Sequence, residues 1–280
     1  MRRKFAKRSL HRRPRLRLRG AALLSMLVEP LRERQAPALA GARSRAARVH
    51  SLPLDGPALR GAAFLLVSLI ASGASAEFSG TASLVSDYRY RGISLSDDKP
   101  AAQVGLAYDD PFGWYAGVFG STVRLGRPAD PGFQTIGYGG FATRLSSNVS
   151  VEIGGDYSAF SSTSYYNYGE VFVGLAGDGI SARVHYAPRY YGQPSNALYG
   201  ELNLTKPLYD RFRLVAHAGY LNVRTTHPYD IKTTQNVVDG RVGVATELDL
   251  FHIELAWVGA SRDYSNTRKN TVVLTILFPF

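Results

Sequence analysis

"TVVLTILFPF", residues 271–280, ends the chain and indicates how the rest of the sequence folds. Apolar side chains stand at every second position up to the terminal carboxylate: Val272, Leu274, Ile276, Phe278 and Phe280. This alternation predicts a β-strand with one continuous apolar face. Because chain ends usually fray in soluble domains, an apolar strand at the terminus indicates a fold in which the last strand has an obligatory partner.

The same period-two alternation recurs through the sequence after residue 76, in runs of about ten residues separated by turn residues. Short turns and longer polar loops follow one another along this series, which is the plan of an outer-membrane β-barrel. The runs predict twelve strands, at 81–91, 100–109, 114–124, 133–145, 149–158, 168–176, 180–188, 197–206, 211–223, 237–248, 251–261 and 270–280.

An unpaired backbone group costs several kcal/mol in hydrocarbon, so the first strand of such a barrel has to pair with the last. We therefore predict an all-β fold: a transmembrane antiparallel up-and-down β-barrel of about 12 strands, with both termini periplasmic. The apolar face of 271–280 is expected to point to lipid and to close the barrel. A soluble β-sandwich or lipocalin-like barrel is the alternative, since alternation alone does not say which face is inside.

The first 76 residues have a different composition from the rest. They hold 16 Lys or Arg and 3 acidic residues, whereas residues 77–280 hold 17 and 19, so the basic character belongs to the front of the chain. "RGAAFLLVSLIASGASA" (60–76) has the pattern of a secretory signal peptide cleaved after Ala76. Residues 1–59 show no sustained period, and we expect a disordered or over-extended N-terminus there. Residues 77–280 would form the barrel, exported to the bacterial outer membrane.

Several classes of site are not supported by the composition. The chain has no cysteine, which excludes a disulfide framework and a thiolate metal site. Its six histidines form no close pair, and no basic patch follows residue 76. We therefore expect no metal, no cofactor and no nucleic-acid partner.

One face of the predicted strands carries charged residues on strand after strand, and we assign this face to the lumen. The residues expected to line it are Arg89, Arg91, Glu152, Asp156, Glu170, Arg183, His185, Glu201, Arg213, His217, Arg241, Glu247, His252 and Glu254. Folding the hairpins about their turns brings Arg183 near Glu201, and Arg213 near Glu247. Such interleaved charges fit a water-filled pore or a salt-bridged plug, and twelve strands lie between the filled and open barrel sizes.

The first long loop is expected at 92–99, with Arg89 and Arg91 approaching it from the lumen and Tyr88 and Tyr90 facing outward. The two arginines would then either influence ion preference at the mouth or pair with nearby Asp residues and hold the loop. Aromatic residues near strand ends further predict two interfacial girdles. They are Tyr88, Tyr90, Tyr108, Trp114, Tyr115, Tyr157, Tyr186, Tyr199, Tyr209, Tyr220 and Tyr264.

Residues 86–123 contain short motifs that resemble those of a known protein family. The matching elements are Tyr88, Arg91-Gly92-Ile93-Ser94, Lys99-Pro100-Ala101, Gly113-x-Tyr115-x-Gly117 and Ser121. With them, the chain resembles the TorF-type porin family, also known as the Gcw_chp family of unknown function. Asp87 and Leu95 stand where that family commonly has Asn and Gln. The resemblance implies an outer-membrane barrel, a channel, and a terminal aromatic residue read by the barrel-assembly machinery; it implies no substrate and no catalytic residue.

We therefore expect a porin-like channel for passive diffusion of ions or small polar solutes. Its partners would be outer-membrane lipid and the barrel-assembly machinery, and its oligomeric state stays open. The neighbouring acids Asp156 and Glu170 would favour cations locally, although near-neutral total charge opposes strong selectivity. The alternative is a non-conducting structural or adhesion-type barrel. A lipid-acting enzyme is disfavoured, and we expect no enzymatic activity, because the histidines lie in no recognisable catalytic motif.

Overall fold

The computed structural model describes residues 77–125, 130–226, 232–262 and 267–280. The expected signal peptide and the segment before it lie outside this range. Its long strands are β1 (Glu77–Val85), β4 (Ala101–Asp109), β5 (Trp114–Leu125), β6 (Asp130–Arg144), β7 (Ser150–Phe160), β8 (Tyr168–Gly177), β9 (Ile180–Ala187), β10 (Ser195–Tyr209), β11 (Phe212–Thr226), β12 (Lys232–Leu248), β13 (Phe251–Ala260) and β14 (Asn270–Pro279). Two short strands, β2 (Arg89–Tyr90) and β3 (Ile93–Ser94), form a separate small sheet. Two 3₁₀ helices, η2 (Ser164–Tyr166) and η3 (Tyr190–Gly192), lie in connections.

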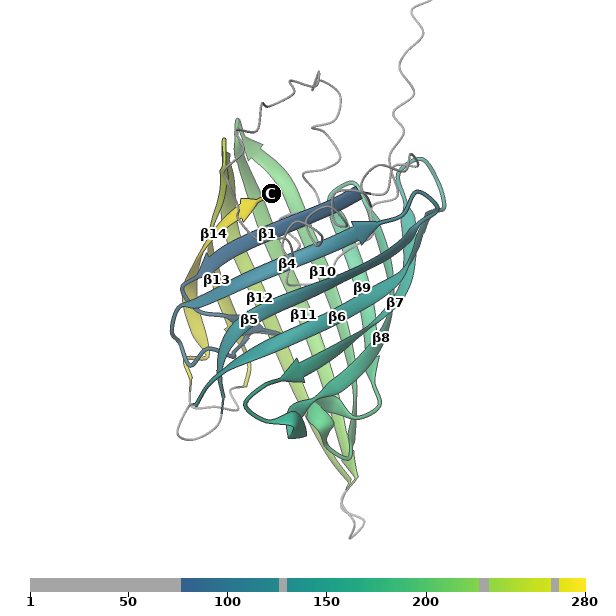
Figure 1. Cartoon of the computed structure of the whole chain (residues 1–280), viewed down its shortest axis with the longest axis vertical. Coiled ribbons are helices and arrows are strands. Elements are labelled where there is room, and N and C mark those ends of the chain that lie inside the picture. The colour runs from purple at the N-terminus through teal and green to yellow at the C-terminus, as the bar shows by residue number, and fades with distance from the viewer. Residues whose placement is uncertain (1–76, 126–129, 227–231, 263–266) are drawn as a thin grey trace, which may run out of the picture.

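The twelve long strands form one closed antiparallel barrel in which every strand pairs with its neighbours in sequence and β1 pairs with both β4 and β14 (Figure 1). The predicted twelve-stranded barrel is therefore confirmed. Tight turns such as Asp178–Gly179 and Asp249–Leu250 join strands at one end, and the longer connections join them at the other. Within the described residues, no helix is long and apolar enough to cross a membrane.

The seam between β1 and β14 closes the barrel. Thr81 stands opposite Pro279 and Val85 opposite Thr275. Beyond this register, Gly80 and Phe280 exchange two backbone hydrogen bonds of 2.9 Å, so the last residue of the chain is part of the sheet. The Phe280 ring occupies the space that a side chain at position 80 would need. Figure 1 shows the yellow end of β14 beside β1.

The two faces of the barrel wall have opposite character. Val272 on β14 and Phe280 just after it are 58% and 65% exposed on the outer face, whereas Val273 and Leu277 are buried on the inner one. Exposed apolar side chains continue around the outer surface, for example Ile153 on β7. Charged residues are buried on the inner face, the reverse of a soluble barrel. A contiguous apolar exterior of this size suits lipid, so the fold is a transmembrane β-barrel.

The first strand differs from its prediction. A strand was expected over 81–91, but β1 ends at Val85, and residues 86–100, which we call the inserted segment, fold into the barrel interior. The alternation of Tyr88 and Tyr90 with arginines resembled a strand, yet Arg91 and Gly92 have positive φ angles of 52° and 74°, which no continuous strand allows. The chain therefore turns back on itself as the β2–β3 hairpin.

Part of the aromatic-girdle prediction was wrong. Tyr88, Tyr90, Tyr115 and Tyr199 are buried inside the barrel rather than exposed at its rims. The reason is that a phenol hydroxyl can bond to the polar interior while its ring packs against apolar wall residues. The outward-facing members of the predicted set include Trp114, Tyr157, Tyr186, Tyr209 and Tyr220. Tyr264 lies outside the described residues.

Candidate functional site

The inserted segment crosses the lumen and bonds to several parts of the wall. Tyr88 Oη donates a 2.8 Å hydrogen bond to Gln134 on β6, and the Arg124 backbone N–H on β5 donates to the Leu95 carbonyl at 2.8 Å. On the far side, Gly92 approaches Asp239 and Gly259 of β12 and β13 so closely that a side chain there would collide with them. The segment is thus held from several strands and narrows the barrel at this level.

Asp87 organises the fold of the segment itself. Its carboxylate accepts hydrogen bonds from Ser94 Oγ at 2.6 Å and Ser96 Oγ at 3.2 Å, and it pairs with Arg89 at 2.6 Å. Arg89 also reaches Asp98 at 3.0 Å. Arg89 therefore pairs with the nearby acids, as one of the two sequence interpretations expected, and holds the hairpin in shape.

Arg91 reaches the opposite wall instead of a loop acid. Its Nη2 lies 2.6 Å from Glu170 Oε2 on β8, and both side chains are almost completely buried. The guanidinium also stands 4.2 Å from the Tyr199 ring centroid and 4.8 Å from that of Tyr90. Burial by itself lowers the pKa of Arg91, but the Glu170 carboxylate and the neighbouring tyrosines together outweigh it and raise the pKa well above its usual value. A permanent charge therefore anchors the segment to the wall.

Between this anchor and the short-turn end, the wall carries a salt-bridged cluster. Arg183 on β9 lies 2.6 Å from Glu152 on β7 and 3.4 Å from Glu201 on β10, so the predicted proximity of Arg183 and Glu201 is present. Tyr115 Oη on β5 donates a 3.2 Å hydrogen bond to Glu152. All three charged residues are buried. One arginine thus links three strands across the interior.

Asp156, Glu170 and His185 face the same part of the lumen from β7, β8 and β9. Asp156 stands opposite Glu170 in the strand register, and one donor atom from each of the three side chains lies within 4.8 Å of the others. His185 is 3.8 Å from Glu170 and 3.7 Å from Glu201. The structure therefore adds His185 to the two acids that the sequence already predicted to be neighbours.

A second polar network lies on β10, β11 and β12. His217 Nε2 is 2.9 Å from Asp239 Oδ1 and 3.1 Å from Tyr199 Oη, and its Nδ1 contacts Asn203. Asp239 was not among the predicted lumen residues, although it stands two positions before Arg241 and so shares its face of the predicted strand. This two-residue spacing from Arg241 is the signal that could have identified Asp239 as a lumen residue.

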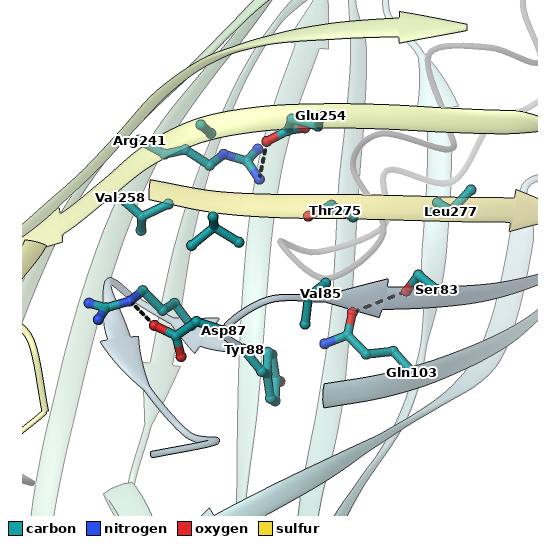
Figure 2. A pocket seen from close by; sticks show the side chains of 13 residues that line it. Ser83, Val85, Asp87, Tyr88, Gln103, Arg241, Glu254, Val258, Thr275 and Leu277 are labelled. Carbon is teal, nitrogen blue, oxygen red and sulfur yellow. Dashed lines mark hydrogen bonds and ion pairs between the residues drawn. The ribbon is translucent and has the colours of Figure 1, made fainter. Parts of the chain in front are cut away.

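A cavity of about 100 Å³ separates the inserted segment from the wall near the closing seam. Figure 2 shows Arg241 and Glu254 above this gap and Asp87 and Tyr88 below it. Arg241 pairs with Glu254 at 3.4 Å. Leu277 and other inward residues of β14 complete the lining. This is room for several water molecules between two sets of charged groups.

The remaining predicted lumen residues lie nearer the short-turn end of the wall. His252 is buried on β13, next in register to Glu247. Arg213 and Glu247 form the predicted ion pair near the short-turn end, where Glu247 is 47% exposed through its side chain. This pair sits at a rim, so solvent screens its charges far more than those of the buried cluster.

Comparison with solved structures finds other barrels at low identity. The KdgM porin is 13% identical, with 72% of this chain and 99% of that chain covered and a TM-score of 0.44. The NanC porin is 12% identical, covering 72% and 98% with a TM-score of 0.47. LpxR from Salmonella typhimurium is 8% identical, covering 72% and 99% with a TM-score of 0.37. No curated protein matches the chain.

A family model described as a bacterial protein of unknown function (Gcw_chp) matches residues 71–276, well over half of the chain. That match extends across the barrel from before β1 into β14. The chain therefore belongs to the Gcw_chp family, as the motifs in residues 86–123 predicted.

Proposed function

We propose that this protein is a porin-like channel of the bacterial outer membrane, through which ions or small polar solutes diffuse passively. The inserted segment forms the narrowest section, and the pathway runs through the cavity beside it. We further propose that the chain is exported with cleavage after Ala76 and that the barrel-assembly machinery inserts its terminal strand. The proposal includes the TorF-type porin name of the resembled family. No specific solute is assigned.

The observation that carries the proposal is the polar cavity between the inserted segment and the wall formed by β12, β13, β14 and β1. Ion pairs stand on both sides of it, Arg241 with Glu254 and Arg89 with Asp87. Because each pair combines both signs of charge, the pathway would accept small polar solutes without strong charge selection. The apolar exterior supports insertion in a bilayer, which gives such a pathway two compartments to connect.

A non-conducting structural barrel is the second candidate. The observation that favours it is the anchoring of the inserted segment by the buried Arg91–Glu170 pair. If that contact held the segment rigidly, the lumen would be closed at this level.

Solute flux into liposomes tests the two candidates. The folded chain should admit small polar solutes and exclude larger ones in a swelling assay. Ala256 is buried and lines the cavity, so Ala256→Trp should fill it and reduce the flux strongly. Leu255→Trp is the matched control, since Leu255 is 55% exposed on the lipid face of the same strand. Equal flux in both variants would refute this pathway, and no flux from the folded unmutated barrel would favour the structural barrel.

A further inference from the structure

Three possible metal ligands lie close together on the lumen wall beside the inserted segment. Asp156 pairs with Glu170 in the β7–β8 register, while His185 lies diagonally across from Glu170 on β9, opposite Phe172. One donor atom from each side chain lies within 4.8 Å of the other two. A first-row divalent cation binds imidazole nitrogen and carboxylate oxygen at about 2.0–2.2 Å. Small side-chain rotations would bring all three donors to that distance.

His185 provides an independent indication. Its side chain is 4% exposed, and neither ring nitrogen forms a hydrogen bond to any described residue. The nearest carboxylate oxygens, on Glu170 and Glu201, are 3.8 and 3.7 Å away, which is too long for hydrogen bonds. Buried polar groups in folded proteins are nearly always bonded. An imidazole that lies between two carboxylates, beyond hydrogen-bond distance of both, leaves room for a third group that it binds.

The local charge points the same way. Among the described residues of this part of the wall, four carboxylates face two guanidinium groups, and these are Glu152, Asp156, Glu170 and Glu201 against Arg91 and Arg183. Buried charge without compensation is strongly unfavourable. A cation of charge +2 would balance the excess while His185 stays neutral, which is the state in which imidazole binds metals.

Glu170 can serve the metal and the inserted segment together. The hydrogen bonds from Arg91 and Tyr90 both go to its Oε2 atom, at 2.6 and 3.2 Å. Its Oε1 atom accepts neither of these bonds and remains available to a cation, while Oε2 is the oxygen that lies 3.8 Å from His185 Nδ1. Because imidazole combined with carboxylate suits Zn²⁺ and similar transition metals better than Ca²⁺ or Mg²⁺, the donor set also limits the kind of metal.

We propose that the barrel binds one divalent transition-metal cation, of the Zn²⁺ class, through Asp156, Glu170 and His185, with water completing its coordination. No metal was expected from the sequence, since the ligands come from three separate strands and form no local motif. The site does not depend on conduction. A barrel that passes no solute would still bind the cation, and a conducting barrel could lack it.

The test measures Zn²⁺ binding to the full chain, folded in detergent micelles without a histidine tag, by equilibrium dialysis with elemental analysis. The unmutated chain should hold a tightly bound ion that His185→Gln and Asp156→Asn each weaken at least about tenfold, the scale seen when metal-site partners are lost. His252→Gln is the matched control. His252 is also a buried lumen histidine whose ring nitrogens bond to no described residue, but it stands on β13, away from these acids.

Co²⁺ gives a second readout, because visible absorption from bound Co²⁺ should appear in the unmutated chain and in His252→Gln and be lost in His185→Gln. Gel mobility before and after heating verifies that each variant is folded, and Asp156→Asn carries the test if His185→Gln does not fold. Unchanged Zn²⁺ affinity in the folded ligand variants would overturn the proposal. So would an equal loss in His252→Gln, or the lack of saturable binding by the unmutated chain.

Discussion

Glu170→Gln should release the inserted segment from the barrel wall. The substitution keeps the shape of the side chain but removes the charge that pairs with Arg91 at 2.6 Å. Arg91 cannot lose its proton, so it would remain buried without its counter-charge. Removing one partner of a buried ion pair typically costs about 3–5 kcal/mol. The rings of Tyr90 and Tyr199 would still attract the guanidinium and offset on the order of 1 kcal/mol.

A net loss of about 3 kcal/mol raises the open population of the segment on the order of 100-fold, since each 1.4 kcal/mol is a factor of ten. Hydrogen exchange measured by mass spectrometry reports this population, because the Leu95 amide is protected by a 2.7 Å bond to the Tyr88 carbonyl. Peptides covering the segment should exchange on the order of 100-fold faster in Glu170→Gln, while the wall strands stay protected.

Lys99→Gln provides the matched control, because Lys99 pairs with Asp97 at 2.8 Å within the same segment but is 53% exposed. An exposed pair contributes about 0–1 kcal/mol, so exchange should change by less than about fivefold. A second variant, Arg91→Met combined with Glu170→Met, replaces the pair with apolar groups and should restore much of the protection. Equal exchange in Glu170→Gln and Lys99→Gln would refute the anchoring role of the Arg91–Glu170 pair.

One deletion and two substitutions, the latter each with a control, test other parts of the fold. Deleting Phe280 removes two backbone hydrogen bonds at the closing seam, so the folded fraction in membranes should fall sharply on a heat-modifiability gel; an unchanged fraction would contradict the closing role. Arg183→Met leaves two buried carboxylates without their cation and should lower the free energy of unfolding by about 3–5 kcal/mol in a urea titration. The control Arg213→Met removes an arginine at the rim and should lower it by at most about 1 kcal/mol. Equal effects of the two substitutions would contradict the stabilising role of the buried cluster. Gly219→Ala places a methyl group against Tyr199 Oη and should cost about 1–3 kcal/mol, whereas Gly200→Ala meets no atom within 4 Å and should be nearly neutral.

The barrel could be predicted from the sequence because the alternation of apolar residues is visible within each strand. Closure then follows from the need to pair every strand edge in lipid. Every second residue of 271–280 is apolar, and these residues do point outward from a strand that pairs with β1. The ion pairs of Arg183 with Glu201 and of Arg213 with Glu247 also followed from folding hairpins about their turns.

The inserted segment could not be predicted in the same way. Tyr88 and Tyr90 alternate with arginines as strand residues do, and nothing local shows that Arg91 pairs with Glu170, 79 residues away in the chain. The positive φ angles of Arg91, Asp97 and Asp98 depend on contacts with the lumen wall and on the Asp87 hydrogen bonds. Long-range contacts of this kind override local pattern, so the loop expected at 92–99 is instead part of a lumen element.

Single-channel recording in a planar bilayer tests the central claim that this barrel conducts past its inserted segment. The folded, unmutated chain should give small, discrete conductance steps with weak ion selectivity. Replacing residues 88–98 with a short Gly-Ser loop should increase the step size, because the narrowest section is then removed. A folded barrel that shows no steps until that replacement is made would contradict the claim and identify a closed, structural barrel.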